Sequence, residues 1–283
     1  MAVGYSDEYV AKCYATLRGR LMRTLIQGSP LVEWLRRGQR LLPPPPLPHT
    51  VPPCRINDAL EKAAPHFRTH GWAFVENILD QQFHRALKEH WPQRRYFTAP
   101  FDRYKSYDKG FGWVVRNPAE DIWSPRRARD LACGDSEYPG YAELHPHIRA
   151  LFDFFASTDF AARLTRFTGR DGPLVFNRFQ LTRTYTGTLV APHRDSNQHT
   201  KNWVSMIFHI AGTGGPQSGG LAILGDNRFE HVIFEAQNLT NTCVLYNPAA
   251  PFFHGVRPVA VGKFRWMVAA EFVCPDDEAG SSG

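Results

Sequence analysis

The sequence contains no long apolar run. None of its hydrophobic stretches approaches the roughly 18 consecutive apolar residues that a membrane-spanning helix needs, so we expect no transmembrane segment. The first residues, Met1 to Glu8, contain neither the basic stretch nor the apolar core of a secretory signal. These two absences predict a cytoplasmic protein.

Cysteines are few, odd in number and scattered. The five cysteines show none of the paired spacings that are typical of disulfide frameworks or zinc sites. We therefore expect reduced thiols, as in other cytoplasmic proteins. The five are Cys13, Cys54, Cys133, Cys243 and Cys274.

Lysine is scarce as well. Of the 33 basic residues only seven are lysine, and the net charge is +6. An arginine excess suits an anionic substrate, because arginine makes bidentate contacts with carboxylates and phosphates, but a bias in composition would give the same excess. No cluster of basic residues is interleaved with aromatic residues, so we expect no nucleic-acid partner.

Apolar residues, in contrast, are abundant. They make up 43% of the 283 residues and include 20 Phe and 7 Trp, enough for one sizeable core. We predict a catalytic domain at 54–283, preceded by an extension at 1–53 with helices at 6–27 and 31–42 and a proline-rich linker. The arginines of the two helices form either a solvated face packed on the domain or a docking surface for a membrane, a carrier protein or an anionic polymer.

The first part of the predicted domain is mainly helical. Apolar spacing predicts helices at 56–70, 81–90 and 142–168 and a strand at 71–78. The segment 96–125, which includes Trp113, is rich in aromatic residues and lacks periodicity. We expect irregular structure or short strands there, either as a substrate lid or as aromatic packing.

From Leu174 onward the pattern changes to short runs rich in β-branched and aromatic residues, separated by turn signals. Eight such runs predict a mostly β fold with buttressing α-helices, a double-stranded β-helix or jelly roll with its core at 174–273. The predicted strands are 174–184, 188–195, 203–210, 220–224, 231–234, 241–246, 254–258 and 265–273.

Two histidines and one carboxylate stand out in these strands. His193 and Asp195 are two positions apart, so a strand would place both side chains on one face. Alone, these two residues or His254 would be ordinary polar residues of a strand or loop. Together they match the facial triad of non-haem iron(II) sites. Arg265 lies in an otherwise apolar strand and, if buried, needs an anionic partner, either a ligand or an internal acid such as Glu271.

With this arrangement the sequence resembles the iron(II)- and 2-oxoglutarate-dependent dioxygenases, in particular their prolyl-hydroxylase-like and phytanoyl-hydroxylase-like branches. The family pattern of His-x-Asp, a distal His and an Arg after about ten more residues is matched by His193-Arg194-Asp195, His254 and Arg265. The run that begins at Gly219-Gly220 is similar to the family's Gly-Gly-x-Leu strand. The resemblance covers roughly residues 70–273, and Met267 departs from it, because many members have Ser there.

The resemblance implies Fe(2+), 2-oxoglutarate and O2, with His193, Asp195 and His254 as metal ligands and Arg265 as the partner of the distal carboxylate. It also implies hydroxylation of an unactivated C–H bond, with succinate and carbon dioxide as co-products. Tyr185 either binds the 2-oxo acid, as tyrosines near this position do in related enzymes, or packs the rim of the barrel.

Further polar residues are candidates for ligand contacts. Asn177 and Arg183 share a strand face with Tyr185 by period two, so burial would make Asn177 a cosubstrate contact and Arg183 a substrate contact. Asn197 and Trp113 are candidates for the site entrance. We expect a small metabolite or biosynthetic intermediate as substrate. A peptide, a carrier-bound group, a membrane glycolipid, or a non-catalytic cupin-like protein that binds a metal or ligand, stay open as alternatives.

Overall fold

The computed structural model describes residues 51–91, 121–123, 145–185, 190–195, 202–216, 218–257 and 259–274. The predicted helices at 6–27 and 31–42 lie outside these ranges, as do Trp113 and Asn197. None of the helices in the described ranges combines the length and the apolar character needed to cross a membrane. Cys54, Cys243 and Cys274 are free thiols.

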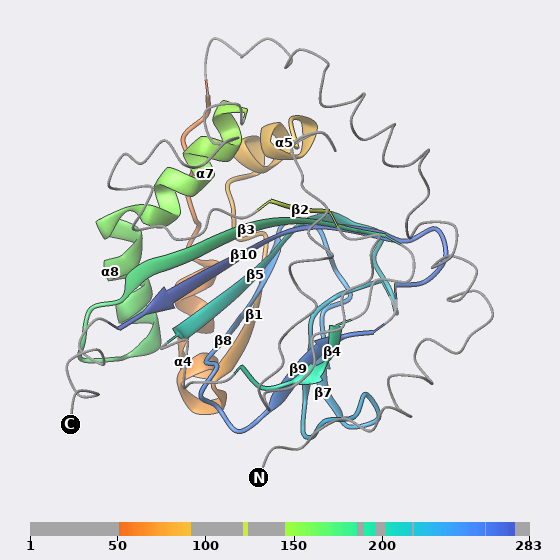
Figure 1. The fold of residues 1–283 in the computed structure, drawn as a ribbon. Helices are drawn as coiled ribbons and strands as arrows, with labels where there is room; N and C mark the ends of the chain where they lie inside the picture. The colour runs from red at the N-terminus through yellow and green to blue at the C-terminus, as the bar shows by residue number, and fades with distance from the viewer. Residues whose placement is uncertain are drawn as a thin grey trace.

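Two antiparallel sheets face each other (Figure 1). The larger has the strand order β1-β8-β5-β10-β3-β2 and the smaller has the order β4-β9-β6-β7. This arrangement confirms the predicted jelly roll. The strands of the larger sheet are β1 (Trp72–Glu76), β2 (Asp121–Trp123), β3 (Val175–Tyr185), β5 (Asn202–Gly212), β8 (Thr242–Tyr246) and β10 (Phe264–Val273), and those of the smaller are β4 (Val190–His193), β6 (Ala222–Leu224), β7 (Val232–Glu235) and β9 (Phe253–Val256).

Helices cover the face of the larger sheet that points away from the smaller one (Figure 1). They are α4 (Ala59–His70), α5 (Gln81–Glu89), α7 (Pro146–Ala156) and α8 (Thr158–Thr168). The prediction of one helix at 142–168 was wrong, because the chain breaks at Ser157. Ser157 has an extended backbone, with ψ at 146°, and its hydroxyl caps α8 by accepting from the Phe160 amide at 3.2 Å.

Alternation along the strands separates two apolar layers. On β10, Val268, Ala270 and Phe272 belong to the large core shared with the helices, whereas Met267 belongs to the smaller core between the sheets. The inner layer also contains buried polar side chains. The strand residues in this set are Gln180, Thr182, Thr184, Ser205, His209, Thr242 and Arg265.

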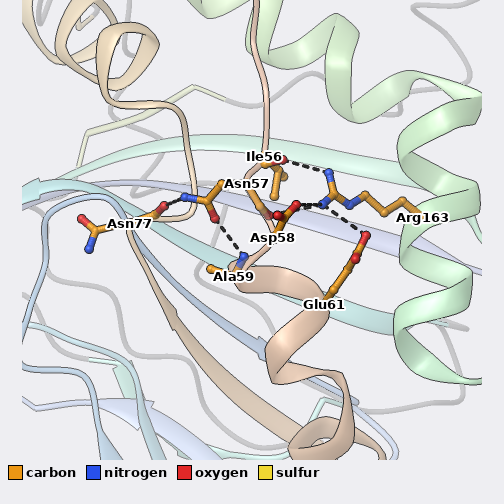
Figure 2. A network of polar contacts seen from close by, with 7 residues as sticks. All are labelled: Ile56, Asn57, Asp58, Ala59, Glu61, Asn77 and Arg163. Atoms are coloured by element: carbon orange, nitrogen blue, oxygen red, sulfur yellow. Dashed lines mark hydrogen bonds and ion pairs between the residues drawn. The ribbon is translucent and has the colours of Figure 1, made fainter.

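A polar network joins the start of α4 to the rest of the helical layer (Figure 2). Asn57 accepts from the Ala59 amide at 3.0 Å and donates to the Asn77 carbonyl next to β1. Arg163 of α8 donates to the Ile56 carbonyl at 2.8 Å and lies 3.4 Å from the carboxylate of Glu61. Because Glu61 is exposed, the backbone contacts hold this junction more than the ion pair does.

Candidate metal centre

Two strands of the smaller sheet position the two predicted histidine ligands. His193 on β4 and His254 on β9 are direct cross-strand partners, with ring centroids 4.2 Å apart. The register of β4 against β9 shifts between Val190 and His193, and Pro192 lies within this irregularity. A proline is tolerated there because a bulge relaxes the demand for a ladder hydrogen bond.

Gly255, which follows His254, allows the two strands to approach closely. A Cβ atom at this position would lie 2.9 Å from the Val190 carbonyl oxygen and 3.1 Å from the Cα atom of Pro192. Backbone atoms cannot give way as a flexible side chain can. A larger residue at Gly255 would therefore push β9 away from β4 and separate the two histidines.

Asp195 completes a cluster of three possible ligands. Its Oδ1 atom lies 3.6 Å from Nε2 of His193 and 3.7 Å from Nε2 of His254. All three ligand atoms lie within 4.8 Å of one another. Asp195 itself lies two residues past the end of β4, so the prediction that it belongs to the strand was wrong. The chain nevertheless brings its carboxylate to the same side as the His193 imidazole.

Tyr246 on β8 reaches this cluster from the larger sheet. Its hydroxyl donates to Oδ2 of Asp195 at 3.1 Å and lies 3.2 Å from Nε2 of His254. The sequence reasoning did not select Tyr246. Alternation along strand 241–246 places Thr242, Val244 and Tyr246 on one face. That pattern alone does not predict which residues of the other sheet this face contacts.

The surroundings set the protonation states that a metal site requires. Burial, together with the neighbouring His193, lowers the pKa of His254 to about 3, so its imidazole is neutral at pH 7. Burial by itself would raise the pKa of Asp195, but the two histidines and the Tyr246 hydrogen bond lower it below its ordinary value. Burial and the charge of Asp195 raise the pKa of Tyr246, so the phenol keeps its proton and can donate.

These three side chains fit a divalent transition metal. Two imidazoles and one carboxylate on one side of an ion form the facial triad that suits non-haem iron(II). Both histidines are buried, at 9% and 4% exposure. The carboxylate is ionised and accepts a hydrogen bond from Tyr246, as ligating carboxylates usually do from a neighbouring group.

Arg265 also lies between the two sheets, but at a different position along the strands. It is 1% exposed, on the face of β10 that also carries Met267, and it pairs with Thr184 of β3 and Gly212 of β5. Gly212 ends β5, whereas Ser205, near the other end, pairs with Tyr246. Arg265 therefore lies further along the interior than the triad.

The neighbours of Arg265 are polar. The Thr184 hydroxyl donates to the Arg265 carbonyl at 3.2 Å. His209 is fully buried, and its pKa is lowered by burial and then by the charge of Arg265. Its Nδ1 atom lies 3.2 Å from the Thr242 hydroxyl, and its Nε2 atom has no hydrogen-bond partner among the described residues.

Of the other predicted contacts, Arg183 lies outside this interior. Arg183 pairs with Trp266 and its guanidinium lies 5.2 Å from that ring, on the face that packs toward the helices. Asn177 lies at the irregularity where β3 passes Glu271 and Phe272 of β10, at the end of β3 away from Tyr185. Tyr185 ends β3 and pairs through its backbone with Phe264. Roles for Asn177 and Tyr185 stay predictions.

Arg257 follows β9 and has a different environment from Arg265. Its Nε atom lies 3.0 Å from Oε2 of Glu235, and its guanidinium lies 5.0 Å from the Phe229 ring. Arg257 therefore forms a salt bridge within the smaller sheet and is not a purely solvated residue.

Comparison with known proteins gives structural matches only. No family model matches the chain, and no curated protein sequence matches it. A prolyl hydroxylase from Trichoplax adhaerens, solved with a peptide of the hypoxia inducible factor oxygen degradation domain, superposes with a TM-score of 0.50 at 15% identity, over 79% of this chain and 93% of that one. AviO1 from Streptomyces viridochromogenes Tue57 gives 0.50 at 18% identity, over 78% and 97%. At these identities, what these proteins share with this chain is the jelly-roll fold.

Proposed function

We propose that this chain is an iron(II)- and 2-oxoglutarate-dependent oxygenase that hydroxylates an unactivated C–H bond, with succinate and carbon dioxide as co-products. The observation that carries the proposal is the convergence of His193, Asp195 and His254, with their ligand atoms within 4.8 Å of one another. Three protein ligands leave positions open for a 2-oxo acid and dioxygen. Iron(II) bound there would activate dioxygen, which is the oxidant, with the 2-oxo acid as co-reductant, and the protein would supply position and exclusion of water.

Tyr246 would fix the orientation of the carboxylate ligand. With Oδ2 of Asp195 held by the Tyr246 hydroxyl, Oδ1 stays directed at the two histidine Nε2 atoms. Partners of this kind usually strengthen metal binding, because they reduce the freedom that a ligand loses on coordination.

Arg265 would bind the distal carboxylate of 2-oxoglutarate. A buried guanidinium on the inner face can give two charge-assisted hydrogen bonds to a carboxylate. Met267 takes the place of the serine found in many relatives, and we assign the second contact to His209, which lies close to Arg265. The His209 Nε2 atom can donate when the Thr242 hydroxyl turns its hydrogen from the Asn238 carbonyl to Nδ1.

A small metabolite or biosynthetic intermediate is the proposed substrate class. The connections around the smaller sheet are short, such as residues 247–252 and 257–263, and leave no room there for an inserted peptide-binding element. The Trichoplax enzyme was solved with a peptide, so peptides belong in the same test, together with carrier-bound groups and glycolipids.

The test is succinate formation from 2-oxoglutarate with iron(II) and ascorbate, first without substrate and then across panels of these four classes. Mass spectrometry should find a product that gains one oxygen atom in the panel that stimulates succinate release. Asp195→Ala should lose turnover by at least about three orders of magnitude, because only two ligands remain. If no panel gives succinate and the addition of iron(II) changes nothing, the protein would instead be a non-catalytic, cupin-like binding protein.

A further inference from the structure

Three histidines meet outside the candidate metal centre. His90 follows the last residue of α5, His145 caps the N-terminus of α7, and His147 lies in the first turn of α7. Residues 91–144 separate the first from the other two in sequence. His145 and His147 are buried, at 8% and 2% exposure, whereas His90 is exposed and gives solvent access to the cluster.

The distances within this cluster suit ligands of one ion. The possible ligand atoms of the three side chains lie within 4.8 Å of one another. The Nδ1 atoms of His145 and His147 are 3.1 Å apart. Two nitrogens bound to a tetrahedral zinc at about 2.0–2.1 Å are separated by about 3.3 Å. In the metal-free protein these two Nδ1 atoms are hydrogen-bonded to each other, and the His145 Nδ1 atom also accepts from the His147 amide at 3.4 Å, so an ion held by both Nδ1 atoms would replace these contacts.

Two ring nitrogens in the cluster lack protein partners. The Nε2 atoms of His145 and His147 are buried and have no hydrogen-bond partner among the described residues. A buried polar atom left in this way costs about 1–3 kcal/mol, and an ion or a water is a common explanation for it. Each of the two imidazoles thus has one ring nitrogen, Nε2, without a partner among the described residues, and this atom is the alternative ligand to Nδ1.

The electrostatics favour the form that binds metal. Burial lowers the pKa of His145 to about 4, and the neighbouring His90, His147 and Arg149 act in the same direction. Burial and His90 also lower the pKa of His147, against a smaller opposing effect of Glu89. Both imidazoles are therefore neutral at pH 7, and a metal would not need to displace a proton from a charged ring.

This cluster is separate from the His193–Asp195–His254 centre. Phe83 of α5 contacts the His147 ring and belongs to the core between the helices and the larger sheet. Tyr246, which touches the triad, belongs to the core between the two sheets. In Figure 1, α5 and α7 lie on the side of the larger sheet opposite to β4 and β9.

We propose that His90, His145 and His147 bind a second divalent transition-metal ion of the zinc class. Imidazole suits such ions, and three histidines leave a fourth position for water or another residue. The three rings are nearly parallel: the His90 plane is inclined by 10° to His145 and by 7° to His147, and the His145 and His147 planes by 5° to each other. An ion lies in the plane of each ring that binds it, so the rings, above all the exposed His90, must rotate out of this stack when the ion binds. The bound ion links the end of α5 to the start of α7, which are separated in the sequence by residues 91–144.

The test is to count zinc ions bound per chain by the metal-free full-length protein, freed of any histidine tag, in competition with a chromophoric chelator. Wild type should bind two ions. His254→Ala should remove one, His147→Gln the other, and the combined variant both. In the His254→Ala background, zinc should raise the melting temperature, and His147→Gln should abolish that rise.

Two further variants control for misfolding of the variant protein and for zinc binding by surface histidines. His90→Asn changes an exposed side chain, so it should fold normally and weaken the second site at least tenfold. The control is His66→Asn with His70→Asn, which removes an exposed histidine pair with ring centroids 4.4 Å apart and should leave two tightly bound ions. The proposal is overturned if His254→Ala protein binds no zinc, or if folded His90→Asn and His147→Gln proteins retain wild-type affinity at the second site.

Discussion

The two faces of the larger sheet come from the same strands and have different chemistry. The face toward the helices carries apolar side chains, and the Phe155 ring contacts those of Phe179 and Phe208 there. The inner face combines an apolar cluster with buried Thr182, Thr184 and other polar groups. Buried polar groups cost free energy unless they are satisfied. We conclude that apolar packing on the helical face stabilises the fold. The inner face contains polar groups that cost stability and that line the candidate site.

The largest expected effect tests the helical face. Phe208 is fully buried, so Phe208→Ala should lower the free energy of unfolding by about 3–5 kcal/mol. Ile233→Ala is the matched control, because Ile233 is 56% exposed, and its loss should cost about 0.5 kcal/mol or less. Urea denaturation measures both. Equal losses in the two variants would contradict the place of Phe208 in the core of the helical face.

The next effect tests the inner face. If Arg265 binds the distal carboxylate, Arg265→Gln removes two hydrogen bonds to a charged group, each worth about 1.5–3 kcal/mol. The Michaelis constant for 2-oxoglutarate should then rise by about two orders of magnitude, with iron affinity little changed. Pyruvate, which lacks the distal carboxylate, should be affected far less.

A structural role for Arg265 predicts a different result. Glu271 lies on the same face of β10 but six residues further on, about 20 Å along a strand, which is too far for an ion pair. A purely structural Arg265 would lower the melting temperature of the variant and leave 2-oxoglutarate binding unchanged. Lys263→Gln is the charge-matched control, because the Lys263 amine donates to the Gly214 carbonyl at the surface.

Tyr246→Phe tests the contact between the two sheets at the triad. The variant keeps the ring and removes the hydrogen bond to Asp195. Loss of such a partner typically lowers metal affinity by about 10- to 100-fold, so the iron(II) dissociation constant should rise by about that factor while the melting temperature changes little. An unchanged iron affinity would show that Asp195 is oriented without Tyr246.

The last expected effect is the pH dependence of stability in the metal-free protein. His254 has a pKa of about 3 when folded, against an ordinary value of 6.5, so the unfolded chain binds the additional proton between these values. Stability should therefore fall as the pH decreases from 6.5 toward 3, by up to about 1.4 kcal/mol per pH unit for this group. Thermal unfolding of wild type and His254→Gln measures it, and identical slopes would contradict the assignment.

The sequence predicted the jelly roll because strand alternation is a local signal, and the eight predicted strands were found with small shifts at their ends. It also predicted the three residues of the triad that the fold brings together. It could not predict Tyr246, whose contacts with Asp195 and His254 cross from one sheet to the other. The same limit applies to Arg183, because period two alone does not say which face of β3 meets the helices.

The break at Ser157 and the histidine cluster show two further limits. The apolar stripe continues through both α7 and α8, so a single helix fits the spacing as well as two helices do. Ser157 marks the break only through its capping contact. His90 and His145 are separated by residues 91–144, and only tertiary packing of α5 against α7 places them together.

In the proposed enzyme His193, Asp195 and His254 hold iron(II) and leave room for 2-oxoglutarate. The most direct measurement is the visible absorption of the anaerobic protein after addition of iron(II) and 2-oxoglutarate. Wild type should develop the weak charge-transfer band of that complex, and Asp195→Ala and His254→Ala should not. Folded wild-type protein that gives no band, or a band of equal strength in either variant, would contradict the account.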